Sequence, residues 1–273
     1  MIDIPAVRMT VDLNCSIEHN KFLIPDAYML LGIDGWNHYK KQALKASKKH
    51  HWITKVPQAF WRGADSGQTY GISEDEAWAN LGQYFPRMEL VRLSHNHPDK
   101  INARLTTIYK VESDVRERMR LLGIESMINK TFMNVEQHVR YRYLVSVDGW
   151  TAAWMRVPWI LSSNSLLLRQ SSPRVEWFDY ALQPMVHYYP INWNLSNLVE
   201  AVDYLEKNQE EAQDLVRAAN SFAEKFFSEQ AMNEYTMTVF GDYAAAQRAN
   251  FTEYDKELVV DFDMNYLLLA ELE

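Results

Sequence analysis

Residues 142–193, RYLVSVDGWTAAWMRVPWILSSNSLLLRQSSPRVEWFDYALQPMVHYYPINW, alternate short apolar runs with amphipathic segments. The apolar runs predict strands, and the segments between them predict helices. In chain order the expected elements are a strand at 143–147, a helix at 151–161, a strand at 165–168, a helix opening at 174–176 and a strand at 185–190. Strands and helices that alternate with short connections are typical of a parallel sheet covered by helices.

The predicted sheet also indicates where a ligand would bind. Ligands of parallel sheets lie beyond the carboxyl ends of the strands. Asp148 and Gly149 follow the first predicted strand and residues 170–176 follow the second, so we expect both segments to line one crevice. Arg156 and Glu176 are expected to project into it, the first as a cation for phosphates and the second as a carboxylate for sugar hydroxyls.

Composition excludes several classes of protein. The chain has 273 residues, of which 47% are hydrophobic, enough for two modest domains or one large one. Its formal net charge of -8 argues against nucleic-acid binding. No apolar run approaches the roughly 20 residues that span a bilayer, and no signal-peptide core is evident at the start. The single Cys15 leaves no internal disulfide and favours a reducing compartment, so we expect a cytoplasmic protein.

A helix expected at 36–49 carries Lys41, Lys45, Lys48 and Lys49 at three- and four-residue spacing. Such a pattern is typical of a solvated helix face. Alternatively, it would dock an anionic acceptor or place the protein at the periphery of a membrane.

The rest of the chain is divided on similar grounds. Further strands are predicted at 5–14, 56–61 and 88–93, and a helix at 113–122. A boundary near residue 110, between the third of these strands and that helix, gives an N-terminal domain at 1–110 and a C-terminal domain at 111–250. Residues 251–273 form a tail that is expected to pack back on the N-terminal domain.

A glycine-bracketed turn supplies a second candidate site. Gly63 and Gly67 enclose a turn directly after the predicted strand at 56–61, and Arg62 adds a fixed cation. This arrangement suits an anion but is also common in ordinary turns. Paired across a cleft with Arg156, Arg62 would neutralise the charge of a departing diphosphate. Alternatively, Arg156 would form a surface salt bridge. Glu176 would lie in the first turn of a helix, where the helix dipole favours a carboxylate whatever its function.

Metal-binding patterns are weak. The histidine pairs at 50–51 and 95–97 lack the spacing and companion ligands of a zinc site. Asp261 and Asp263 have the spacing that metal-dependent glycosyltransferases use, but they follow no nucleotide-binding unit. We expect a surface or strand-end pair there and no metal, with a metal-dependent transferase as the alternative.

These segments resemble a known family. Residues 142–208 are similar to the C-terminal half of glycosyltransferase family 90, and FWRGADSG at 60–67 resembles its (F/W)-R-G-x-x-(S/T)-(G/S) motif. The resemblance implies an α/β fold of the compact GT-B type, with two Rossmann-like domains facing across a cleft. It implies an inverting, metal-independent transfer of xylose or glucose to a hydroxyl of a glycan or glycoconjugate acceptor. UDP-xylose or UDP-glucose would be the co-substrate, and no other cofactor is expected.

The resemblance also assigns roles to residues. Arg62, Gly63 and Ser66 would contact the donor from the glycine turn, and Arg156 would be the second diphosphate contact. Two pairs complete the expected donor site, namely Asp148 with Gly149 at the nucleotide and Ser172 with Glu176 at the phosphate and ribose.

The catalytic base is the point of departure from the family. The family places an aspartate where this chain has Cys15, and a neutral thiol is a poor base for a sugar hydroxyl. Asp12 is therefore the expected base, followed by Glu18 and Asp26. The alternative function is a catalytically inactive module that binds glycans or nucleotide sugars on the same fold.

Overall fold

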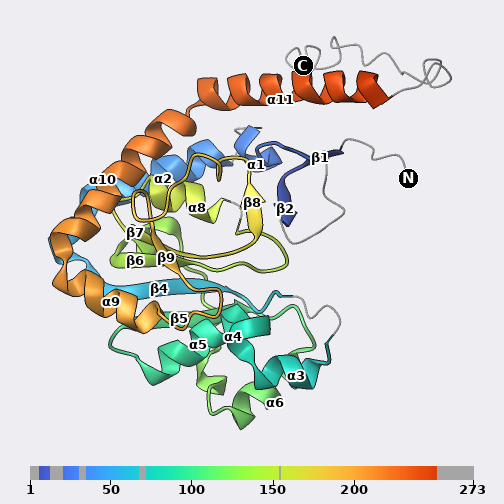
Figure 1. Ribbon diagram of the computed structural model, residues 1–273. Helices are drawn as coiled ribbons and strands as arrows, with labels where there is room; N and C mark the ends of the chain where they lie inside the picture. The colour runs from blue at the N-terminus through green and yellow to red at the C-terminus, as the bar shows by residue number, and fades with distance from the viewer. Residues whose placement is uncertain (1–5, 13–20, 31–34, 68–71, 154, 251–273) are drawn as a thin grey trace, which may run out of the picture.

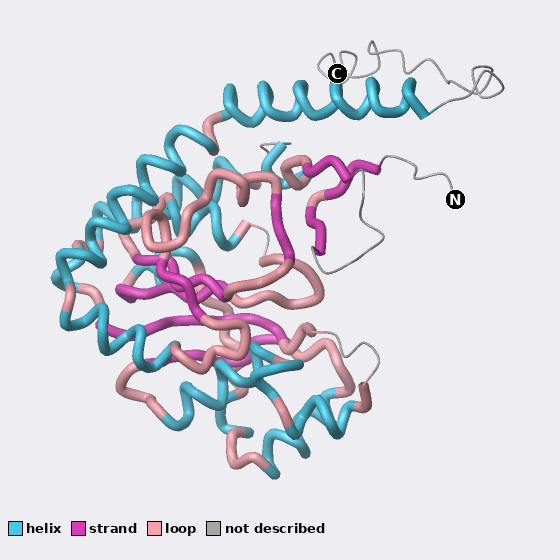
Figure 2. The backbone as a smooth tube through the Cα atoms, viewed as in Figure 1, coloured by secondary structure: helices cyan, strands magenta, loops and turns pink. Residues whose placement is uncertain are grey.

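A parallel five-stranded sheet forms the centre of the computed structural model, which describes residues 6–12, 21–30, 35–67, 72–153 and 155–250 (Figures 1 and 2). The strand order is β5-β4-β6-β7-β9, and every neighbouring pair is parallel. The strands are β4 (Val56–Ala64), β5 (Ile101–Thr107), β6 (Tyr141–Ser146), β7 (Leu166–Gln170) and β9 (Tyr189–Ile191). This order has one topological switch point, between β4 and β6, where successive connections run to opposite sides.

Helices cover both faces of the sheet, as Figure 1 shows. On one side lie α3 (Glu74–Ala79), α4 (Leu81–Tyr84), α5 (Pro86–Asn96), α6 (Glu112–Leu121) and α9 (Leu198–Lys207). On the other lie α2 (Trp36–Lys49), α7 (Val135–Val139) and α8 (Arg156–Leu161), and α10 (Gln209–Phe226) packs on α8 and β7. From α10 the chain continues into α11 (Glu229–Asn250), a long helix at the edge of the molecule.

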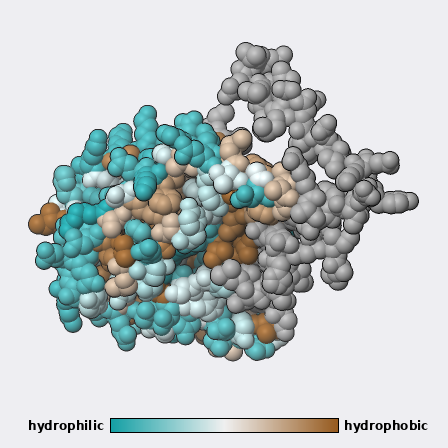
Figure 3. Space-filling view, turned by 45° about the horizontal axis from the view of Figure 1, so that its top comes forward, coloured by the Kyte–Doolittle hydropathy of each residue, from teal (hydrophilic) through white to brown (hydrophobic). Residues whose placement is uncertain are grey.

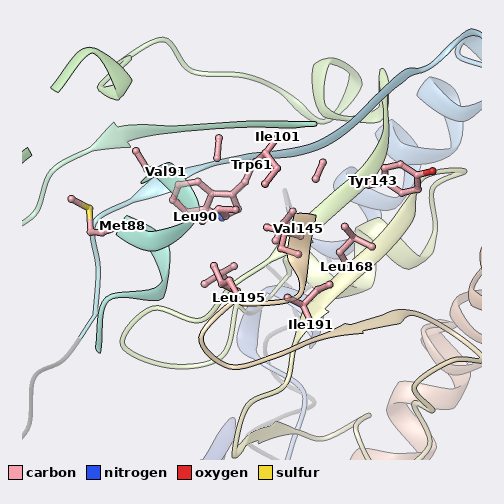
Figure 4. Close-up of a cluster of buried hydrophobic side chains, with 14 of the residues drawn as sticks. Trp61, Met88, Leu90, Val91, Ile101, Tyr143, Val145, Leu168, Ile191 and Leu195 are labelled. Atoms are coloured by element: carbon pink, nitrogen blue, oxygen red, sulfur yellow. The ribbon is translucent and has the colours of Figure 1, made fainter. Parts of the chain in front are cut away.

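Alternation along the strands divides the core in two. Trp61, Tyr143 and Leu168 face the first group of helices (Figure 4), whereas their neighbours Phe60 and Leu144 face the second group. Strands buried on both faces need continuous apolar runs, and the sequence has such runs at 143–147 and 165–168. No helix in the described ranges is long and apolar enough to cross a membrane.

Two small ladders complete the fold. β1 (Ala6–Arg8) pairs in parallel with β3 (Lys21–Leu23), which precedes α1 (Ala27–Leu30). β2 (Thr10–Asp12) pairs antiparallel with β8 (Arg174–Glu176), so that Asp12 lies opposite Arg174 and Thr10 opposite Glu176. The second ladder joins the start of the chain to the segment that follows β7.

The structure changes the type of two predicted elements and shortens two others, since the helix predicted at 151–161 begins at Arg156 and the strand predicted at 185–190 begins at Tyr189. Residues 88–93 belong to helix α5, not to a strand, because an apolar run of six residues fits either period and Pro86 at the first position favours a helix start. Residues 174–176 form β8, not a helix, because they pair with β2, a partner distant in sequence. The helix predicted at 36–49 is confirmed as α2.

The predicted boundary near residue 110 does not divide the sheet. β4 and β5 come before it, yet β4 pairs directly with β6, which comes after it. The described residues therefore contain one Rossmann-like sheet where the sequence predicted parts of two. The tail at 251–273 lies outside the described residues.

A buried lysine at the amino ends of the strands yields a stability prediction. The Lys55 ammonium donates to Ser165 Oγ (2.8 Å) and to the Val139 carbonyl, and burial lowers its pKa from 10.5 to about 7. At pH values between about 7 and 10.5, Lys55 is protonated in the unfolded chain and neutral in the folded chain. The unfolded chain therefore binds one more proton, so wild-type stability rises with pH. Relative to Lys55→Met, the wild-type free energy of unfolding should gain up to about 1.4 kcal/mol per pH unit from pH 7 to 10. Urea unfolding of both proteins across this range checks it; a constant difference would contradict it.

Candidate functional site

The carboxyl ends of β4 and β6 meet at the switch point, and four of the predicted site residues lie at or beside it. Ser66 follows β4, and Asp148 and Gly149 follow β6. Ser172, which comes after β7, donates its hydroxyl hydrogen to the Asp148 carboxylate. The expectation that residues 148–149 and 170–176 share one edge of the sheet is met for Asp148 and Ser172. Ser66, which the sequence places in an N-terminal domain across a cleft, lies instead at the same edge of the same sheet, because β4 pairs directly with β6.

Arg87, a residue that the sequence analysis did not select, joins these segments. From the first turn of α5 its guanidinium donates to the carbonyls of Asp148 (2.9 Å), Val147 (3.2 Å) and Ala64 (3.3 Å), and to Ser66 Oγ. Removal from water lowers the pKa of Arg87 to about 10, so the side chain remains a cation at neutral pH.

Gly149 makes this contact possible. A Cβ at Gly149 would lie 2.8 Å from Arg87 Cζ and would also collide with Ser66 Oγ. Real Cβ atoms do not approach other atoms so closely, so only glycine lets the chain pass at this point. The expected glycine turn is thus explained by the close approach of Arg87 and Ser66.

Arg156 lies at the same edge. At the start of α8, its Nη2 donates to the Arg62 carbonyl (2.8 Å). Its pKa is lowered to about 10, first by burial and then by the neighbouring charge of Arg87. Both guanidinium groups lie beside the indole of Trp61, 5.8 Å (Arg87) and 5.9 Å (Arg156) from its ring centroid. In the described part of the chain neither of them forms a salt bridge, so two cations share one edge without a bonded carboxylate.

Arg62 occupies a different position from the one expected. Its guanidinium donates to the Trp61 carbonyl (2.8 Å) and to both the carbonyl and side-chain oxygens of Asn102 on β5 (2.8 and 2.9 Å). It also stacks over Phe60, 4.3 Å from the ring centroid. The structure therefore brings the Arg62 backbone to Arg156 but turns the Arg62 side chain toward β5. Gly63 packs against Trp61, whose ring atom Cη2 would be 2.9 Å from an added Cβ.

The Asp148 carboxylate balances part of this positive charge. It accepts the Ser172 hydrogen bond and lies 3.7 Å from Arg174 Nη1. Burial raises the pKa of Asp148, whereas Ser172 and Arg174 oppose that shift. Arg174 also donates to the Gly149 carbonyl (3.2 Å), so β8 is tied to the same edge.

Glu176 is buried on β8, not in the first turn of a helix as predicted. Its backbone N–H donates to Asp179 (2.7 Å), and that carboxylate is held by Arg169. Within the described ranges its own Oε2 is buried without a hydrogen-bond partner. Burial raises the pKa of Glu176 well above 4.5; Arg169 opposes this shift, and the carboxylates of Asp179 and Asp148 add to it.

Comparison with known proteins identifies the family. A profile described as glycosyl transferase family 90 matches residues 25–264. The chain belongs to glycosyl transferase family 90. It is 31% identical over 198 residues to human protein O-glucosyltransferase 3, a match that covers 72% of this chain and 33% of that protein. It is 23% identical over 223 residues to mouse protein O-glucosyltransferase 1, covering 81% of this chain and 50% of that protein. The chain thus spans about a third to a half of the length of these curated relatives.

A solved structure shows the same fold. The chain superimposes on a glycosyltransferase from Rickettsia africae ESF-5 with a TM-score of 0.50 and 12% identity, covering 89% of this chain and 64% of that chain. The expected α/β fold is therefore confirmed for this member of family 90, and the described residues contain one Rossmann-like sheet of the GT-B type.

The backbone of Asp12, the expected base, lies close to this edge of the sheet. β2 carries Asp12, whose Cα partner in the ladder is Arg174. Asp26, a further candidate, is buried, and its Oδ1 accepts a hydrogen bond from the backbone N–H of Met29 (3.1 Å). Cys15 and Glu18, together with the Asp261–Asp263 pair, lie outside the described residues. Where side chains are described, no three histidine, cysteine or acidic residues are grouped to hold a metal ion.

A substitution at Gly149 tests the close approach. Gly149→Ala should displace Arg87 and Ser66. The displacement should lower the melting temperature, and it should lower the affinity for UDP, the ligand expected from the sequence, at least tenfold. Gly241→Ala is the matched control, because nothing lies within 4 Å of a Cβ there and alanine favours the helix by up to about 1 kcal/mol. Calorimetric titration and thermal unfolding measure the two effects; wild-type behaviour of Gly149→Ala would contradict the assignment.

The raised pKa of Glu176 gives a pH-dependent stability. Because the folded state disfavours the ionised carboxyl, wild-type stability falls as the pH rises from about 4.5 through the folded pKa. Glu176→Gln cannot ionise, so its advantage in melting temperature over wild type should be greater at pH 7.5 than at pH 4. Thermal unfolding at the two pH values decides this, and a constant difference would show that Glu176 ionises normally.

Proposed function

We propose that the chain is a UDP-sugar-dependent glycosyltransferase. The observation that carries the proposal is the pair of cations, Arg87 and Arg156, at the switch point of the sheet. A partly buried charge without a bonded counter-charge is costly, and a bound diphosphate would supply that counter-charge. A switch point is also where open α/β sheets bind nucleotides.

In this proposal the two guanidinium groups act mainly on the leaving group. Negative charge grows on the diphosphate as its bond to the sugar breaks, so cations fixed beside it stabilise the transition state more than the ground state. Arg87 takes the place that the sequence analysis gave to Arg62, whose side chain supports β5 instead. Ser66 and Ser172 hold Arg87 and Asp148 in position, and Asp148 and Gly149 form the turn next to the nucleotide.

The proposed base is Asp12. The β2–β8 ladder sets its backbone opposite Arg174, whose guanidinium contacts the Gly149 carbonyl in the donor site. A carboxylate there would take the proton of an acceptor hydroxyl while that oxygen attacks the anomeric carbon from the side opposite UDP. Such an in-line displacement inverts the anomeric centre and uses no metal ion.

The donor is proposed to be UDP-glucose or UDP-xylose, and the acceptor a hydroxyl of a glycan or glycoconjugate. The names of the two relatives, both protein O-glucosyltransferases, support glucose and a protein-linked acceptor. Incubating the chain with each UDP-sugar and measuring UDP release tests the proposal. UDP binding without any release would favour the inactive binding module, and loss of activity in a chelator would contradict metal independence.

The role of the arginine pair can be tested directly. Arg156→Ala and Arg87→Ala should each lower the affinity for UDP and the kcat/KM of transfer by at least tenfold, because each removes a charge-assisted contact to the diphosphate. Arg120→Ala is the control, since that exposed side chain pairs only with Glu117 on the surface of α6 among the described residues. Wild-type kinetics in the Arg156 variant would overturn its role.

A further inference from the structure

A buried glutamine, Gln170 at the end of β7, joins the turn after β6 to the loop after β9. Hydrophilic side chains cover much of the described surface on the face shown in Figure 3, whereas Gln170 is only 3% exposed. Its Oε1 accepts a hydrogen bond from the backbone N–H of Asp148 (3.0 Å), and its Nε2 donates to the Trp193 carbonyl (2.6 Å). These two partners fix the orientation of the side-chain amide, because an N–H only donates and a carbonyl only accepts.

The hydrogen bond to Asp148 continues the sheet beyond its last pair. β6 and β7 are paired up to Ser146 and Arg169, so in the described part of the chain the backbone beyond Ser146 has no ladder partner on β7. The Gln170 side chain supplies an acceptor for the Asp148 N–H, and Arg87 supplies a donor for the Asp148 carbonyl (2.9 Å). Both polar backbone atoms of Asp148 are therefore held by side chains from other elements.

The second partner of Gln170 is itself held in place. Trp193 follows β9, and its indole Nε1 donates to the Gln83 carbonyl on α4 (2.9 Å). The backbone of Gln170 pairs with Ile191 in β9. Gln170 therefore ties the Asp148 turn to a segment that is fixed against both the sheet and a helix.

The turn that Gln170 holds leaves little room for movement. A Cβ at Gly149 would lie 2.8 Å from Arg87 Cζ, and the Gly149 carbonyl accepts a hydrogen bond from Arg174 (3.2 Å). A shift of this backbone would therefore move the guanidinium groups beside it. In an active site, misplacement by about 1 Å can lower the rate about a hundredfold.

We propose that Gln170 is a positioning residue of the donor site, which sets the backbone of Asp148 and Gly149 and, through it, the place of the Arg87 guanidinium. This role rests on the proposed function and deepens it, because Gln170 would favour UDP binding without touching UDP. Without the amide, the buried Asp148 N–H would lose its acceptor, which is costly, and the turn would shift toward another partner.

A second glutamine allows this role to be separated from a purely structural one. Gln209, at the start of α10, also joins distant elements, since its Oε1 accepts from Trp52 Nε1 (2.7 Å). Its Nε2 donates to the Tyr143 hydroxyl (3.2 Å) and to the Leu205 carbonyl (3.0 Å). Because Trp52 precedes β4, this amide lies near the amino ends of the strands, away from the Asp148 turn. Loss of either amide should destabilise the fold, but only loss of Gln170 should weaken donor binding.

Amide hydrogen exchange and calorimetric titration of the full chain with UDP test the proposal in Gln170→Met and in the matched control Gln209→Met. Gln170→Met should speed exchange at the Asp148 N–H at least tenfold and weaken UDP binding about tenfold. Gln209→Met should lower the melting temperature to a similar extent and leave both quantities at wild-type values. If Gln170→Met does not fold, Gln170→Asn replaces it. Its amide is one methylene shorter, so it cannot reach both partners and should give the same two changes.

Three results would overturn the role of Gln170. The first is unchanged exchange at Asp148, and the second is faster exchange with wild-type UDP affinity, which would make the amide merely structural. The third is an equal loss of UDP affinity in Gln209→Met, because instability alone would then explain the effect. If the wild-type chain binds no UDP, the proposed function itself fails. Faster exchange in Gln170→Met would even then support the positioning of the turn, and unchanged exchange would overturn that as well.

Discussion

The Arg87 guanidinium bridges the ends of β4 and β6, the two strands that flank the topological switch point. The β4–β6 ladder ends at Phe60 with Leu144, and the buried backbone carbonyls that follow in these two strands need other donors. Arg87 supplies donors to three of them and to Ser66. Because carbonyls and a hydroxyl use its hydrogen bonds without neutralising its charge, the same side chain closes the fold and leaves a cation at its edge. Structure and proposed chemistry therefore depend on one group.

Much of the fold could be predicted because it rests on local patterns. The apolar runs that became β6 and β7 are buried on both faces, and the bounds of α2 coincide with the predicted helix at 36–49. Prediction was wrong where distant partners decide the structure. Residues 174–176 are extended because they pair with β2, and no periodicity in their own neighbourhood shows this. The apolar run at 88–93 is too short to distinguish a helix from a strand.

The same distinction applies to the site. Asp148, Gly149 and Ser172 could be placed together because the ends of parallel strands share one edge. Arg87 was missed for a related reason, since a strand was expected at 88–93 and helix α5 is what brings Arg87 to the edge. Pro86, a common first residue of helices, was the available signal. The prediction that the Arg62 side chain contacts the diphosphate was wrong because its motif shows the cation but not its neighbour. That neighbour is Asn102 on β5, which accepts hydrogen bonds from the guanidinium.

The short ladder between β2 and β8 has a consequence for the geometry of catalysis. Three residue pairs fix the start of the chain against the far side of the sheet, and side chains in a strand alternate between its faces. A slip of one residue would move Asp12 away from its partner Arg174 and replace Thr10 as the neighbour of Glu176. The backbone positions of the proposed base and of Glu176 are thus set by a single register. Any motion that preserves this ladder would carry both residues as one unit.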